Sequence, residues 1–81
     1  MKLVATGLIM KEYFDELTIS QKDACKVLGI SQKHLSNLFR GKVGLTANMA
    51  IKFERLIPEI SASYWLNYEM KYREQKARRT E

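Results

Sequence analysis

Apolar residues recur three and four positions apart along most of this chain, and strict alternation with polar residues is rare. This spacing puts apolar side chains on one face of successive helices, and signals for strands are weak throughout. Pro58 is expected to end one of these helices, because proline cannot continue a helical hydrogen-bond ladder. The pattern predicts an all-α protein with five helices, over residues 8–17, 21–28, 32–40, 47–57 and 62–78.

Three residues separate the second predicted helix from the third, and they have the chemistry of a tight turn. Ser20 can cap the second helix through its side-chain oxygen, and Asp23 places favourable charge near that N-terminus. Gly29 supplies the left-handed conformation that ends the helix, Ile30 points into the core, and Ser31 caps the next helix. The sequence therefore predicts two short helices in the arrangement that enters a DNA major groove.

The remaining helix ends and the core follow from the same pattern. Thr46 and Ser61 are predicted caps of the fourth and fifth helices. Side chains that share the apolar faces are expected to be buried, namely Ile9, Tyr13, Phe14 and Leu17 in the first helix, Leu35 and Leu38 in the third, and Met49, Ala50, Phe53 and Leu56 in the fourth.

Positive charge is concentrated in two parts of the chain. The formal net charge is +5, and residues 20–45 and 71–79 each carry +4, which leaves the remainder at −3. Basic residues among exposed Gln, Asn and Ser on a helix pair are typical of proteins that neutralise DNA phosphates and read base edges. The first cluster consists of Lys22, Lys26, Lys33, Arg40 and Lys42 against Asp23, and the second of Lys71, Arg73, Lys76, Arg78 and Arg79 against Glu74.

Length and cysteine usage exclude several other classes of protein. With 81 residues the chain forms one domain, residues 1–81, too small for a deep cleft between two domains. No apolar run is long enough for a membrane span or a signal peptide, so a cytoplasmic location is expected. Cys25, the one cysteine, is predicted to pack on an apolar face, and no metal site or cofactor is expected. His34 lacks an orienting acid, so the sequence does not predict an enzyme.

The stretch from Ser20 to Gly41 resembles the helix-turn-helix of the Xre/Cro repressor superfamily. In that superfamily an SQ pair opens the first motif helix, a Gly-hydrophobic-Ser turn follows, and a Gly ends the recognition helix. The continuation from Thr46 is similar to the HigA antitoxins, and the YWLN segment at Tyr64–Asn67 is its most discriminating part. Together the matches cover about residues 7–79. The resemblance implies a five-helix lambda-repressor-like domain that represses transcription.

The resemblance also assigns roles to individual positions. Gln21 corresponds to a phosphate contact, and Arg40 and Lys42 match backbone contacts at the end of the recognition helix. Gln32, Lys33 and Asn37 match positions that face base edges, where Gln and Asn suit adenine and Lys suits guanine. Ser36 is expected to reach a base or a phosphate. His34 is expected to contact phosphate, base or only solvent, and it differs from the smaller residues that are common at this position in the family. The full set of predicted DNA-binding residues is Gln21, Ser31, Gln32, Lys33, His34, Ser36, Asn37, Arg40 and Lys42.

An aromatic stripe on the last helix suggests a partner. Trp65, Tyr68 and Tyr72 share one face, which is usually core, but Tyr64, Leu66 and Met70 add more apolar surface than one small core covers. We expect a homodimer through this region, acting on a palindromic operator. Resemblance to HigA further implies an mRNA-cleaving HigB-like toxin as partner. The alternatives are an Xre-type phage or regulatory repressor without a toxin, and an interaction module that has lost DNA binding.

Overall fold

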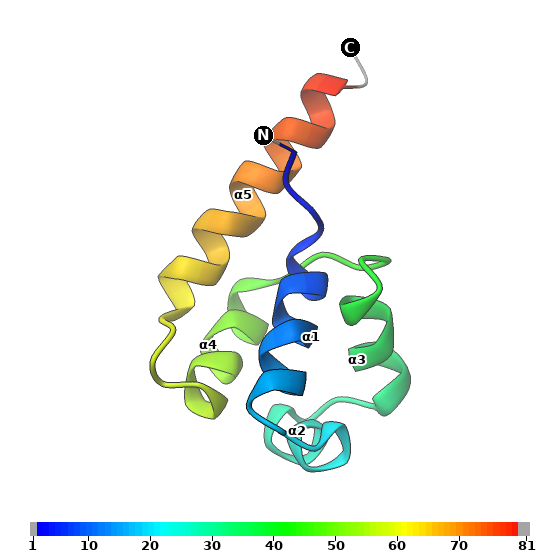
Figure 1. Cartoon of the computed structure of the whole chain (residues 1–81), viewed down its shortest axis with the longest axis vertical. Coiled ribbons are helices and arrows are strands. Elements are labelled where there is room, and N and C mark those ends of the chain that lie inside the picture. The colour runs from blue at the N-terminus through cyan, green and yellow to red at the C-terminus, as the bar shows by residue number, and fades with distance from the viewer. Residues whose placement is uncertain (1, 80–81) are drawn as a thin grey trace.

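Five helices make up the computed structural model, which describes residues 2–79 (Figure 1). The chain is therefore all-α over the described residues, as predicted. No helix among these residues is long and apolar enough to cross a membrane. The helices are α1 (Thr6–Glu16), α2 (Gln21–Leu28), α3 (Gln32–Phe39), α4 (Ala47–Leu56) and α5 (Ala62–Arg79).

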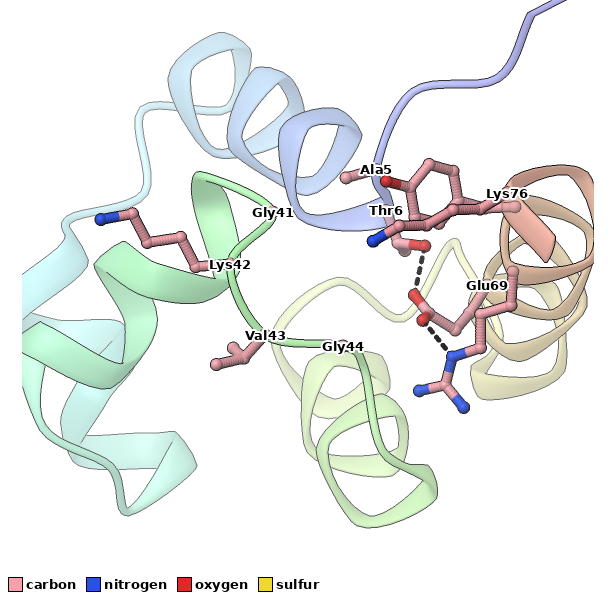
Figure 2. Close-up of a pocket in the computed structure, with 10 residues that line it drawn as sticks. Ala5, Thr6, Gly41, Lys42, Val43, Gly44, Glu69 and Lys76 are labelled. Atoms are coloured by element: carbon pink, nitrogen blue, oxygen red, sulfur yellow. Dashed lines mark hydrogen bonds and ion pairs between the residues drawn. The ribbon is translucent and has the colours of Figure 1, made fainter. Parts of the chain in front are cut away.

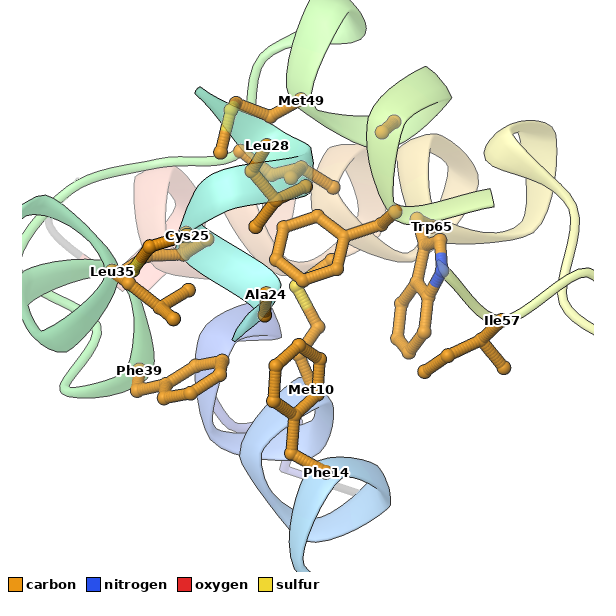
Figure 3. Close-up of a cluster of buried hydrophobic side chains, with 14 residues drawn as sticks. Met10, Phe14, Ala24, Cys25, Leu28, Leu35, Phe39, Met49, Ile57 and Trp65 are labelled. Atoms are coloured by element: carbon orange, nitrogen blue, oxygen red, sulfur yellow. The ribbon is translucent and has the colours of Figure 1, made fainter. Parts of the chain in front are cut away.

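The core lies where α1 to α4 meet, and α5 covers one side of it (Figure 3). Phe14 of α1 is its centre, because its ring packs edge-on against Phe39 of α3 at 5.0 Å and Phe53 of α4 at 5.8 Å between centroids. Such edge-to-face contacts add to the free energy gained by burial. The fully or nearly fully buried apolar side chains are Met10, Phe14, Ala24, Cys25, Leu28, Leu35, Leu38, Phe39, Leu45, Met49, Ala50, Phe53, Ile57 and Trp65.

Trp65 fixes α5 to this core. Its side chain is 0% exposed, and its ring meets those of Tyr13 at 5.7 Å and Tyr64 at 5.6 Å in edge-on geometry. The indole Nε1 is buried and has no hydrogen-bond partner. The predicted core position of Trp65 is confirmed, whereas Tyr68 and Tyr72 of the same stripe are half-buried.

Both ends of α1 differ from the sequence prediction. The helix starts at Thr6, two residues earlier than expected, and Leu17 is 49% exposed rather than buried. Thr18 adopts a positive φ of 53°, and the Ile19 amide donates to the Phe14 carbonyl at 2.9 Å, so the chain turns away sharply after Leu17. Ile19 packs against the core in its place, and Met10, which the pattern missed, is fully buried.

The other helix ends lie close to their predicted positions. The α2 bounds are as predicted, and α3 and α4 each end one residue earlier, at Phe39 and Leu56. The Thr46 and Ser61 hydroxyls accept hydrogen bonds from the amides of Met49 at 3.2 Å and Tyr64 at 3.1 Å, so both predicted caps form.

The segment before α1 runs along α5. Gln75 makes two hydrogen bonds with the main chain of Leu3, accepting from its amide at 3.0 Å and donating to its carbonyl at 3.1 Å. The Tyr68 hydroxyl donates to the Val4 carbonyl at 2.9 Å, and partial burial raises the pKa of this phenol. Polar contacts thus join the segment before α1 to α5.

Candidate nucleic-acid interface

Helices α2 and α3 form the predicted helix-turn-helix. The Ser20 hydroxyl accepts from the Asp23 amide at 3.3 Å, and the Ser31 hydroxyl accepts from the His34 amide at 3.0 Å. Gly29 has a φ of 68° and its amide donates to the Cys25 carbonyl at 2.8 Å. These local interactions determine where each of the two helices starts and stops.

The apolar stripe of α3 determines which side chains face outward. Leu35, Leu38 and Phe39 are buried, so the opposite side of the helix faces solvent. Gln32, Lys33 and His34 are exposed, whereas Ser36 and Asn37 are half-buried beside them. Ser31 lies at the N-terminus of this row, where its hydroxyl serves as the cap. The structure therefore brings all six predicted residues from Ser31 to Asn37 onto one helix and its cap.

Three further predicted residues flank this helix. Gln21 is exposed in the first turn of α2, Arg40 is exposed at the C-terminal cap of α3, and Lys42 is exposed in the following loop. The Lys42 amide donates to the Asn37 carbonyl at 2.9 Å, so the loop is tied to the last turn of α3. The positions at both ends of the helix pair suit contacts to backbone phosphates, because cationic or amide donors there can meet successive phosphates.

Sequence reasoning did not find the polar contacts behind the loop after α3. A pocket of about 220 Å³ lies between this loop and α5, and its lining includes Thr6, Gly44, Glu69 and Arg73 (Figure 2). Glu69 is buried although it is charged. Its spacing of four from Arg73 was a signal for a helical ion pair, but the helix pattern alone gave no reason to expect burial.

The family model described as Helix-turn-helix matches residues 10–65. This chain belongs to that helix-turn-helix family. It is 33% identical over 66 residues to virulence-associated protein A' of Dichelobacter nodosus, and 38% identical over 61 residues to the uncharacterized HTH-type transcriptional regulator YddM of Escherichia coli K12. The two matches cover 82% and 75% of this chain. The chain spans only 57% of the length of the first relative and 64% of the length of the second.

Solved structures extend the likeness to the whole helical arrangement. The antitoxin HigA of Pseudomonas aeruginosa, solved with the higBA promoter, superimposes with a TM-score of 0.81 at 28% identity, covering 91% of this chain and 80% of that one. A Pseudomonas aeruginosa protein in complex with its 28-bp operator DNA superimposes with a TM-score of 0.81 at 27% identity. The match covers 91% of this chain and 81% of that one. A HigA-family antidote protein from Coxiella burnetii superimposes with a TM-score of 0.88 at 22% identity, and this match supports the fold. It covers 99% of this chain and 87% of that one. The resemblance to HigA antitoxins drawn from the sequence is confirmed.

Proposed function

We propose that this helix-turn-helix protein is a sequence-specific transcriptional repressor and the antitoxin of a HigBA-type toxin–antitoxin pair. The observation that carries the proposal is the outward polar row on α3, held by capped helix ends in a fold whose relatives were solved on promoter and operator DNA. A helix of this width fits the major groove of B-form DNA.

The proposed contacts divide into two chemical classes. Gln32, Lys33 and Asn37 read base edges, since amides pair with adenine in two hydrogen bonds and an ammonium donates to guanine. Ser36 and His34 lie between them and reach either a base or a phosphate. Phosphates are bound at the two ends of the helix pair, by Gln21 and Ser31 on one side and by Arg40 and Lys42 on the other.

The functional unit is proposed to be a homodimer. One recognition helix covers too few base pairs for specific binding, whereas two helices one DNA turn apart read a palindrome. Exposed apolar side chains on α5 support this assembly: Tyr64 is half exposed and Met70 is 68% exposed, although both lie on a helix with one buried face.

The toxin partner is proposed from the likeness to HigA, which is an antitoxin. In that role the protein binds a HigB-like, mRNA-cleaving toxin and blocks its activity, and it represses its own promoter. A second candidate is a regulator without a toxin, and the 38% identity to the uncharacterized HTH-type transcriptional regulator YddM favours it.

Two measurements test the proposal. The purified protein is titrated into labelled duplex DNA from upstream of its own gene and into a scrambled duplex, and it is co-expressed with the product of the adjacent gene. We expect tight binding to the first duplex alone and co-purification of a small basic protein. Specific DNA binding without co-purification would exclude the antitoxin role and favour a regulator without a toxin. Failure to bind either duplex would overturn the repressor function.

A further inference from the structure

The carboxylate of Glu69 lies in the middle of α5 and is surrounded by protein. Glu69 is 6% exposed, and each of its oxygens has a donor: Oε1 accepts from the Thr6 hydroxyl at 2.6 Å, and Oε2 accepts from Arg73 Nε at 2.6 Å. A buried carboxylate is costly unless it is paired in this way. Glu69 therefore holds the first residue of α1 and the side chain of Arg73 in fixed places.

Arg73 carries the connection onward to the loop that follows α3. Its Nη2 donates to the Leu45 carbonyl at 3.3 Å, and the guanidinium lies beside Gly44. Because Arg offers several donors in one rigid plane, it can bind the carboxylate and the carbonyl together. One ion pair on α5 is thus joined to the loop comprising Gly41–Leu45.

Two glycines of this loop lie close to neighbouring side chains. A Cβ on Gly44 would lie 2.7 Å from Arg73 Nη2 and 3.1 Å from Glu69 Oε2, and one on Gly41 would lie 2.8 Å from the Ala5 Cβ. Gly41 also has a φ of 77°, which favours glycine. At Gly44 the loop therefore lies against the Glu69–Arg73 pair, whereas the Lys42 side chain points away from that pair (Figure 2).

The other arm of the network reaches α3 through α1. Gly7 follows the Thr6 that binds Glu69, and a Cβ on Gly7 would overlap the main-chain oxygen of Leu38. The first turn of α1 thus lies directly on the backbone of the last turn of α3. The two arms therefore hold the loop that carries Lys42 at opposite ends, at Leu38 in the last turn of α3 and at the Leu45 carbonyl before α4.

We propose that Glu69 and Arg73 are positioning residues for DNA binding: together they fix the loop after the recognition helix so that Lys42 meets a backbone phosphate. The inference rests on the proposed DNA-binding function. A loop with two glycines would otherwise sample many conformations, and ordering it on binding would weaken affinity. Neither residue needs to contact DNA for this role.

The test compares Arg73→Ala with Arg78→Ala. Both changes remove an arginine from α5 that pairs with a glutamate four residues earlier, Arg73 with Glu69 and Arg78 with Glu74, but only Arg73 bonds to the loop. Binding to a duplex selected from a random library is measured by fluorescence anisotropy over a range of salt. Because Lys42 loses its fixed position, we expect Arg73→Ala to weaken binding about three- to tenfold and Arg78→Ala to have little effect.

A double-mutant cycle with Lys42→Ala separates positioning from direct contact. If Arg73 acts through Lys42, the double variant binds no more weakly than Lys42→Ala alone, and the salt slope falls by about one unit in both. Additive losses with a slope lower by about two units would make Arg73 a phosphate contact and overturn the positioning role.

Conservative variants guard against an effect on folding. Glu69→Gln keeps an acceptor for Arg73 and can donate to the Thr6 hydroxyl, so it should bind DNA within about twofold of wild type. Arg73→Lys keeps the charge but cannot make both bonds, so it should resemble Arg73→Ala. The inference would be overturned if Arg73→Lys bound DNA as tightly as wild type, or if Arg73→Ala and Arg78→Ala bound equally. In either case, DNA binding by the wild-type protein would leave the proposed function intact. If wild type binds no duplex, the proposed function itself fails.

Discussion

At the scale of single residues, the outward side of α3 supports different roles for residues only a few positions apart. Gln32 is exposed at the start of the helix and Asn37 is half-buried near its end, whereas Lys42 lies beyond it in the loop. An amide that reads a base edge contributes to one sequence only, but an ammonium beside a phosphate contributes to all sequences. The two classes are therefore separable by experiment.

Replacing Gln32 or Asn37 by Ala should cost about 1–3 kcal/mol on the preferred duplex and little on random DNA, because a base-edge pair is lost while phosphate contacts remain. Competition binding with both duplexes measures this difference. Equal losses on the two duplexes would remove the residue from the base-reading set.

Lys42→Ala should act without regard to sequence. Affinity is expected to fall on specific and random DNA alike, and the slope of log affinity against log salt should shrink by about one unit, because one phosphate is no longer neutralised. A salt titration on both duplexes checks this. An unchanged slope would mean that Lys42 contacts no phosphate.

Trp65 is the residue on which the position of α5 depends. Trp65→Ala should lower the free energy of unfolding by about 3–5 kcal/mol, because a fully buried indole is lost and a cavity remains. Trp65→Phe is the matched control: it keeps an aromatic ring beside Tyr13 and Tyr64 and removes the unpaired Nε1. Chemical unfolding should give a much lower free energy of unfolding for Trp65→Ala than for Trp65→Phe. A melting temperature of Trp65→Ala within a few degrees of wild type would contradict the core role.

At the scale of the helix, the caps offer a way to separate stability from function. Ser31 caps α3 and Ser61 caps α5 through hydrogen bonds of nearly equal length, 3.0 Å and 3.1 Å. Ser31→Ala and Ser61→Ala should each reduce stability by about 0.5–2 kcal/mol, since each leaves one helical amide without its acceptor. Only Ser31→Ala should also weaken DNA binding, because α3 carries the polar row. Equal DNA binding by the two variants would argue against a role for the start of α3.

At the scale of the whole molecule, the shape of the chain favours an assembly through α5. The described residues extend 40 by 25 by 23 Å, and α5 runs along the long dimension past the other helices (Figure 1). Its exposed apolar side chains, Tyr64 and Met70, are not covered by other residues that the structure describes. A second copy would bury them and bring a second recognition helix to the DNA.

Light scattering should therefore give twice the chain mass of 9.4 kDa at tens of micromolar. Met70→Lys should shift the protein toward monomer without lowering its helix content, because Met70 is largely exposed. Lys71→Ala, which changes the neighbouring exposed residue, serves as the control. A wild-type protein that stays monomeric both free and on DNA would overturn the dimer.

The sequence by itself determined the helices, their caps and the outward row on α3. These features depend on residues three or four apart, so Ser20, Gly29 and Ser31 were sufficient to locate the motif. Even so, Leu17 was predicted to be buried, because the pattern could not show that Thr18 takes a positive φ and turns the chain away.

Only the tertiary structure decided what lies behind the loop after α3. The partners Thr6 and Glu69 are 63 residues apart, and Arg73 reaches the Leu45 carbonyl across 28 residues. Glutamate in a helix is usually solvated, so nothing local distinguishes the buried Glu69 from the exposed Glu74. Burial of such a charge depends on which donors packing brings to it, and the packing of α1, α5 and the loop is settled by the whole core together.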